Sequence, residues 1–184
     1  GVVTEVTHRT QTIILEQAYN NPVVFAQPLS FHGSDPAVVR VTNISPHQFD
    51  LLVAEPSNQN GTHGVEETVS YIVLEAGSHL FADGRQLEVG TVMSSATVGR
   101  TVDTPVWETV QYVTSFSMPP VVISQTQTTL GEAFLSTRQQ TITADSFQVG
   151  LQQEERITTQ HTAETIGYLA IEPGSGHWNG MLFD

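Results

Sequence analysis

Short apolar runs separated by turn residues follow one another along the whole chain. Residues 12–15, 22–27, 48–54 and 68–75 are rich in β-branched and aromatic side chains, and polar stretches such as residues 58–61 divide such runs. Evenly spaced short strands of this kind favour antiparallel sandwiches over alternating strands and helices. The pattern therefore predicts an all-β fold built from antiparallel β-sandwiches.

The chain also repeats itself at a fixed offset. Residues 22–27 return as residues 120–125, so that the offset from Pro22 to Pro120 is 120 − 22 = 98. At this offset Arg40 corresponds to Arg138 and His63 to His161, and after one deletion residues 67–77 correspond to residues 164–174. An offset that holds over most of the chain indicates internal duplication. We predict two tandem sandwiches of about six strands each, spanning residues 1–92 and 93–184.

The charge of the chain restricts its partners. Six basic residues stand against 19 acidic ones, for a net charge of −13, and there is no Cys. Nucleic acids and anionic membranes are disfavoured partners because like charges would meet. The lack of Cys excludes disulfides and thiolate metal sites. No apolar run approaches the length of a membrane span, and no signal peptide is visible, as expected for an excised module or a mature fragment.

A glutamate closes the last predicted strand of each copy, on the same strand face as a tyrosine. The residues concerned are Tyr71 and Glu75 in the first copy and Tyr168 and Glu172 in the second. A glutamate buried on an apolar face needs a partner, and the duplicated Arg40 and Arg138 are the candidates. An Arg–Glu pair or a backbone-bonded glutamate would fix the fold, whereas exposed members of this set would bind a ligand.

Other candidate binding residues are imidazoles, carboxylates and indoles. His63 and Glu67 precede the last strand of the first copy, as His161 and Glu164 do in the second. Such a pair could hold a metal ion, bind a sugar hydroxyl, or cap a loop. Indoles stack on sugars when they are exposed and otherwise pack in cores. The tryptophans are Trp107 and Trp178, and the turn carboxylates that could take calcium are Asp35, Asp83, Asp103 and Glu132.

Each copy resembles the H-type lectin domain, a six-stranded antiparallel sandwich. The matching stretches are Tyr19 to Gln27, Ile44 to Leu51 and Val69 to Glu75, and in the second copy Phe116 to Gln125, Ile142 to Val149 and Ile166 to Glu172. That family binds N-acetylgalactosamine through an Asp, an Arg and aromatic residues. Pro36 and Phe134 stand where its Arg would lie, and Pro56 and Glu154 where its Trp would lie. The resemblance therefore implies the fold and does not carry over the family's sugar site.

Residues 161–174 also resemble the ending His-x-x-Glu-Thr-Val-x-Tyr-x-x-x-Glu-x-Gly of bacterial extracellular modules that occur in tandem. That resemblance implies a secreted or surface location and covalently joined neighbouring domains. Neither His-Glu-x-x-His nor Gly-x-Ser-x-Gly occurs, so a non-catalytic protein is predicted over a glycan lyase or hydrolase.

We predict a carbohydrate-binding module of a larger secreted or surface protein, acting on a polysaccharide or glycan. The alternative is a structural or adhesive spacer without a small ligand. Nucleic acid and membrane insertion are not expected, whereas self-association and calcium binding stay open. The candidate binding residues are Arg40, His63, Glu67, Tyr71, Trp107, Arg138, His161, Glu164, Tyr168 and Trp178.

Overall fold

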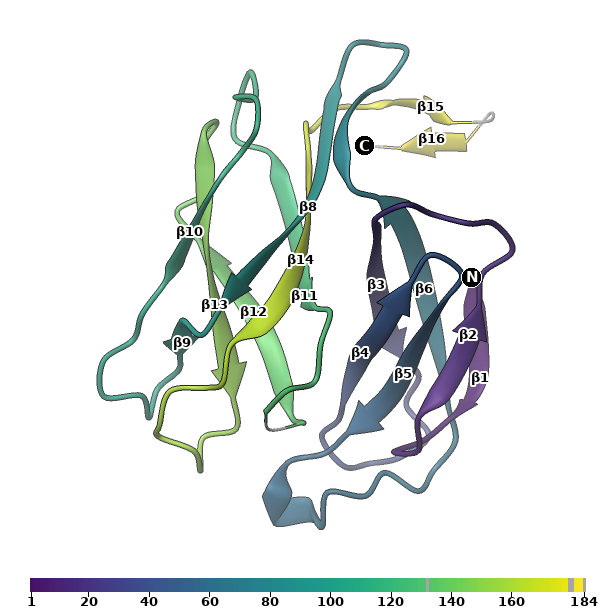
Figure 1. The fold of residues 1–184 in the computed structure, drawn as a ribbon, viewed down its shortest axis with the longest axis vertical. Helices are drawn as coiled ribbons and strands as arrows, with labels where there is room; N and C mark the ends of the chain where they lie inside the picture. Colours follow the sequence, from purple (N-terminus) through teal and green to yellow (C-terminus); the bar gives the residue numbers. More distant parts are fainter. Residues whose placement is uncertain (132, 179–180, 184) are drawn as a thin grey trace.

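The first half of the chain forms one β-sandwich of two three-stranded antiparallel sheets. The computed structural model describes residues 1–131, 133–178 and 181–183. The strands are β1 (Val2–Val6), β2 (Gln11–Ile14), β3 (Pro22–Leu29), β4 (Val38–Ser45), β5 (Gln48–Ala54) and β6 (Glu67–Glu75). They pair in the orders β1-β6-β3 and β2-β5-β4 (Figure 1). A 3-10 helix, η1 (Ser57–Gln59), follows β5.

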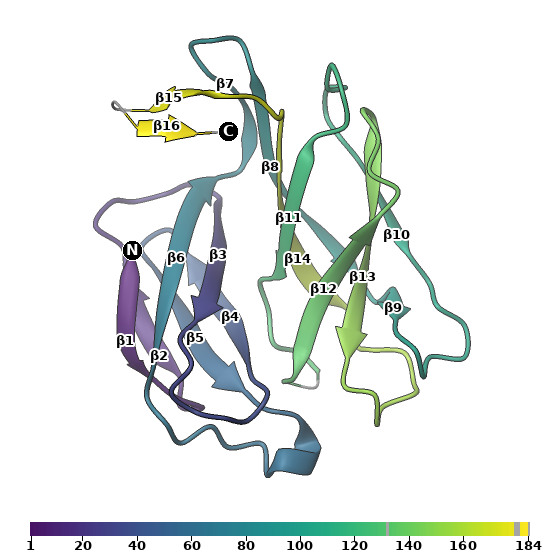
Figure 2. The same ribbon diagram turned by 180° about the vertical axis from the view of Figure 1, so that it is seen from behind.

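The second half forms another sandwich beside the first, with one added hairpin (Figure 2). Its sheets run in the orders β11-β14-β8-β7 and β10-β13-β12, and β9 adds in parallel to β13. The strands are β7 (Gly77–Leu80), β8 (Gln86–Ser94), β9 (Thr97–Val98), β10 (Glu108–Gln111), β11 (Val121–Thr126), β12 (Leu135–Gln140), β13 (Ser146–Gln153) and β14 (Glu164–Ile171). The chain then forms a terminal hairpin of β15 (Gly176–Trp178) and β16 (Met181–Phe183).

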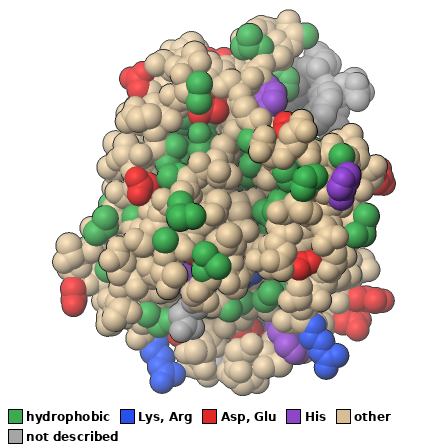
Figure 3. Space-filling view, viewed as in Figure 1, with side chains coloured by type: hydrophobic (Ala, Val, Ile, Leu, Met, Phe, Trp, Pro, Cys, Tyr) green, Lys and Arg blue, Asp and Glu red, His purple; other side chains and the backbone are tan. Residues whose placement is uncertain are grey.

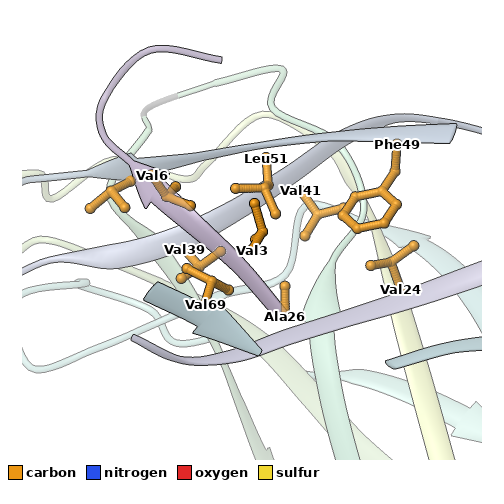
Figure 4. Packing of buried hydrophobic residues seen from close by; sticks show 10 residues of the cluster. Val3, Val6, Val24, Ala26, Val39, Val41, Phe49, Leu51 and Val69 are labelled. Atoms are coloured by element: carbon orange, nitrogen blue, oxygen red, sulfur yellow. The ribbon is translucent and has the colours of Figure 1, made fainter. Parts of the chain in front are cut away.

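Each sandwich has its own hydrophobic core. In the first half, Val24 and Ala26 of β3 face Phe49 and Leu51 of β5 across the space between the sheets (Figure 4). The second core is built around Phe147, whose ring stacks on Tyr112 at 5.7 Å between centroids. Alternate residues of each strand enter these cores because successive strand side chains point to opposite faces. Burial of these apolar faces stabilises each sandwich separately.

The predicted all-β fold is confirmed, and the order of pairing is the same in both halves. In this order β8 takes the place of β1: Gly1 and Gly90 lie against the rings of Tyr71 and Tyr168, respectively. The predicted boundary between residues 92 and 93 thus falls inside β8, which pairs with β14 from Ser94 back to Leu87. A common origin of the two halves stays a prediction.

Candidate functional site

Arg40 is placed by β4 at the contact between the two sandwiches. Its neighbours Val39 and Val41 enter the first core, so strand alternation turns Arg40 toward the second sandwich. The side chain is 0% exposed. Its Nη1 donates to the Ala133 carbonyl at 2.6 Å, and its Nη2 donates to the Thr128 carbonyl at 2.7 Å. Burial lowers the pKa of the guanidinium, while the nearby Glu164 carboxylate acts in the opposite direction.

Glu164, at the start of β14, contacts Arg40 and also hydrogen-bonds to a loop of its own sandwich. Its Oε1 lies 3.3 Å from Nη2 of Arg40 and accepts from the backbone N–H groups of Leu130 at 2.9 Å and Gly131 at 3.2 Å. The hydroxyl of Thr128 donates to the other carboxylate oxygen. Hydrogen bonding of this extent is what a fully buried carboxylate requires.

The edge of β3 is covered by two glutamines of the second sandwich. Oε1 of Gln127 accepts from the N–H of Val24 at 2.8 Å, and Oε1 of Gln125 accepts from the N–H of Ala26 at 2.7 Å. The amide nitrogen of Gln127 returns a bond to the Val24 carbonyl at 2.8 Å. The side-chain amides thus occupy the place of a neighbouring strand, which satisfies backbone groups that an open edge would leave unpaired.

Apolar side chains complete the contact. Val23 and Phe25 of β3 form a buried cluster with Val89 of β8, and Leu169 of β14 packs against it. The approach is close, since a Cβ added to Gly167 would lie 2.6 Å from Cγ1 of Val23. β3 and β4 lie on the side of the first sandwich that faces the second (Figures 1 and 2). Polar, ionic and apolar contacts therefore join the two sandwiches along these strands.

Glu67 of the first sandwich sits in a pocket built like that of Glu164. It accepts from the backbone N–H groups of His32 at 3.1 Å and Gly33 at 2.8 Å, and from the hydroxyl of Ser30. Burial raises the pKa of Glu67, but these hydrogen bonds together outweigh it and lower the pKa. His63 Nε2 lies 3.3 Å from Oε1 of Glu67.

A hollow of about 300 Å³ opens beside Glu67. It is lined by residues 29–31, 33–37, His63 and Glu67. His63 is buried within it, and its Nδ1 hydrogen-bonds to Oε1 of Glu55 at 2.8 Å. A single imidazole therefore lies between two buried carboxylates on one side of the hollow.

The remaining candidate residues do not gather at one surface. Tyr168 is buried and donates its hydroxyl to Oε1 of Glu88 at 2.8 Å; burial, with help from Glu88, raises its pKa. Tyr71 packs edge-on against Phe49 at 5.1 Å between centroids. Trp107 is partly buried, and the side chain of Trp178 in β15 lies outside the described part of the structure.

His161 and Arg138 differ from their counterparts in the first half. His161 is buried, and its Nδ1 donates to the Thr162 carbonyl at 2.6 Å and not to a glutamate. Arg138 is exposed on β12. The structure thus brings Arg40 together with Glu164 and His63 together with Glu67, while the use of this set in ligand binding stays a prediction.

The strand-closing glutamates are backbone-bonded. Glu75 accepts from the N–H groups of Asn20 at 2.8 Å and Asn21 at 2.6 Å. Glu172 accepts from the N–H groups of Gln86 at 2.9 Å and Ser117 at 3.0 Å. Of the two structural alternatives, an Arg–Glu pair and a backbone-bonded glutamate, the structure supports the second for Glu75 and Glu172. Arg40 contacts Glu164 instead.

Sequence reasoning missed Gln125, Gln127, Glu55 and Glu88. For Gln125 the sequence offered one indication, since Gln27 stands at the same place in the first copy.

Among the described residues, no group of three or more His, Asp or Glu side chains is arranged to hold a metal ion. Likewise, the described part of the chain has no helix long and apolar enough to cross a membrane.

The fold and the contact between the two halves describe the protein as a pair of acidic β-sandwiches, which a buried arginine and two edge-covering glutamines join. Acidic side chains are scattered over the face shown in Figure 3.

No protein-family model matches the chain, and no solved structure gives a significant match. The chain is similar to halomucin of Haloquadratum walsbyi, with 27% identity over 174 residues that cover 89% of this chain and 2% of halomucin. The chain thus spans about 2% of the length of this curated relative, and the similarity is compatible with an extracellular module.

Proposed function

We propose that the chain is a structural spacer of a larger extracellular protein, in which two sandwiches act as one rigid unit without catalytic activity. The observation that carries this proposal is the complete burial of Arg40 between the halves. A guanidinium that donates to two carbonyls and a carboxylate is held in a fixed direction, because its fork of donors is planar. Rotation of one sandwich against the other would break these bonds together.

The remaining contacts favour the same function. The glutamine amides tie the edge of β3 to the second sandwich, and the Val23, Phe25 and Val89 cluster excludes water beside them. Contacts between domains in one chain commonly permit relative motion unless the interface is large and apolar. Here directional hydrogen bonds to backbone groups add to the apolar contact, so we propose a stiff element within a long protein.

The rotational diffusion of the two halves tests this proposal. In ¹⁵N relaxation measurements, backbone amides of both sandwiches should report one common tumbling time, that of a single 20.0 kDa body. Arg40→Ala should separate the tumbling times, whereas Arg156→Ala, which removes an exposed arginine of the second sandwich, should not. Separate and shorter tumbling times for the halves of the unmodified chain would refute the rigid spacer.

Glycan binding is a second candidate function, and one observation favours it. A surface hollow of about 590 Å³ is lined by Tyr19 and Tyr71 together with Glu16 and Gln17. Tyrosine rings and short polar groups of this kind bind the apolar faces and hydroxyls of sugars. The amide of Gln17 donates to the hydroxyl of Tyr19 at 2.8 Å, which orients that ring at the hollow.

A panel of glycans and insoluble polysaccharides, with calcium and then with a chelator, tests glycan binding. Saturable binding that Tyr19→Ala abolishes would support it, and sensitivity to the chelator would support calcium as a ligand. Lack of binding across the panel by folded protein would contradict glycan binding and leave the spacer function unaffected.

A further inference from the structure

We propose that the hollow at Glu67 is a docking site for an arginine of a second copy of this chain, and that Arg138 is this arginine. Copies would then associate head to tail through a contact like the one between the two halves. The inference extends the proposed structural function and rests on it, because it adds a partner to the rigid unit.

The receiving side is already built in the first sandwich. Glu67 and Glu164 each accept a serine or threonine hydroxyl, from Ser30 and Thr128 respectively. Each also accepts the N–H of a glycine at 2.8–3.2 Å, Gly33 in the first case and Gly131 in the second. The two carboxylates therefore present the same oxygen atoms in the same loop environment.

The two pockets differ in what faces the carboxylate. Oε1 of Glu164 meets the guanidinium of Arg40 at 3.3 Å, whereas Oε1 of Glu67 meets Nε2 of His63 at 3.3 Å. His32 Nδ1 lies 3.8 Å from Oε2 of Glu67. Imidazoles, and no arginine among the described residues, thus stand near this carboxylate.

The chemistry of the hollow suits a guanidinium. Asp35 and Glu67 line the hollow. Glu55 is buried and hydrogen-bonds to His63, which also lines it. Arg40 donates to the carbonyls of Thr128 and Ala133, and at the offset of 98 the corresponding carbonyls belong to Ser30 and Asp35. A planar fork of donors matches a carboxylate flanked by carbonyls better than an ammonium does.

The entering side is present on the second sandwich. Arg138 pairs with Gly150 on β13 as Arg40 pairs with Leu52 on β5, so the two arginines hold the same register. Arg138 is exposed, and none of the described residues forms a hydrogen bond or an ion pair with it. The Arg138 guanidinium is therefore accessible to the hollow at Glu67 of a second copy.

Apolar residues of the internal contact are buried, whereas their counterparts in the other half of the chain are exposed. Val23 and Phe25, which are 1% and 9% exposed in the internal contact, correspond to Val121 and Ile123, which are 51% and 49% exposed. On the receiving side, Leu169 packs into the internal contact. Its counterpart Ile72 is 59% exposed. Ile72 and Ile123, however, line one hollow of about 310 Å³ between the two sandwiches, together with Phe25 and Gln125. Of these exposed counterparts, Val121 lies outside the lining of that hollow.

The contact between copies should be weaker than the internal one. Leu29 stands at the place of Gln127, so one of the two edge-covering glutamines is absent, while Gln27 keeps the place of Gln125. The net charge of −13 also makes two copies repel. Salt screens this repulsion, with a Debye length of about 8 Å at physiological ionic strength and about 3 Å at 1 M, while buried pairs are screened less. Association should therefore increase with salt.

Sedimentation equilibrium of the full chain at about 1 M NaCl tests the proposal. The unmodified chain should form species larger than the monomer in a concentration-dependent manner. Arg138→Ala and Glu67→Gln should each weaken association at least tenfold, whereas Arg156→Ala, which removes another exposed arginine of the same sandwich, should not.

Mixing the two variants makes the test specific. Arg138→Ala keeps an intact hollow and Glu67→Gln keeps an intact arginine, so their equimolar mixture should form a heterodimer that neither forms alone. Recovery in the mixture would also show that each variant is folded at its intact site. A chain that stays monomeric at about 1 mM, or association that Arg138→Ala leaves unchanged, would overturn the proposal. A monomer that tumbles as one body would still satisfy the proposed spacer function.

Discussion

Replacement of Arg40 by methionine tests how much the buried arginine stabilises the protein. The variant keeps a long side chain at the contact but removes the donors to Thr128, Ala133 and Glu164. Loss of one partner of a buried ion pair costs about 3–5 kcal/mol. Glu164 keeps donors from Thr128, Leu130 and Gly131, so we expect the lower end, about 3 kcal/mol, in the free energy of unfolding.

Urea denaturation followed by tryptophan fluorescence and circular dichroism measures this loss. Arg138→Met is the matched control, because it removes the same groups from an exposed site at the same register, and it should change the free energy of unfolding by less than about 0.5 kcal/mol. If Arg40→Met cost under about 1 kcal/mol, the range of an exposed ion pair, the buried arginine would not hold the halves together.

Three other changes test the same structure. Gln125→Ala and Gln127→Ala should each cost about 1–3 kcal/mol and speed hydrogen exchange at the Ala26 and Val24 amides, while exposed Gln140→Ala should do neither. Gly167→Ala, whose Cβ would meet Val23, should cost about 1–3 kcal/mol in a thermal or urea melt, whereas Gly64→Ala, which faces open space, should not. The lowered pKa of Glu67 means that its stabilisation is present above the unfolded value of about 4.3 and is lost as the pH falls through the folded value. Urea titrations from about pH 7 to pH 3 should therefore show a smaller acid loss in Glu67→Gln than in the unmodified chain, and equal losses would contradict the role given to these hydrogen bonds.

The alternation of apolar and polar residues was sufficient to predict the fold class and most strands, because it directly reflects which strand faces are buried. The position of the predicted boundary between residues 92 and 93 was less informative, because it falls within β8. Gly90 of the same strand lies against the Tyr168 ring, and a Cβ there would meet the hydroxyl at 2.5 Å. This close packing depends on a tyrosine 78 residues further along the chain, so no local pattern indicates it.

The site could be predicted only where its members are close in sequence. His63 and Glu67 are four residues apart, and the structure places them in contact. Arg40 and Glu164 are 124 residues apart and belong to different sandwiches, so no local pattern joins them. Glu75 illustrates the converse: its backbone partners at Asn20 and Asn21 depend on the path of a turn, which side-chain pairing rules do not describe.

The equivalence of β1 and β8 has a consequence for how such a chain folds. β8 follows β6 along the chain after only the short β7 segment, so during folding it is a nearby competitor for the edge of β6 that β1 occupies. The two strands differ in shape, since β1 carries a bulge between Val3 and Val6 with Glu5 at a φ of 61°, whereas β8 pairs with β14 without a shift. A bulge fixes register and twist, so it discriminates between the two edges. Straightening that bulge would invite strand exchange between neighbouring sandwiches, the characteristic misassembly of multidomain and repeat proteins.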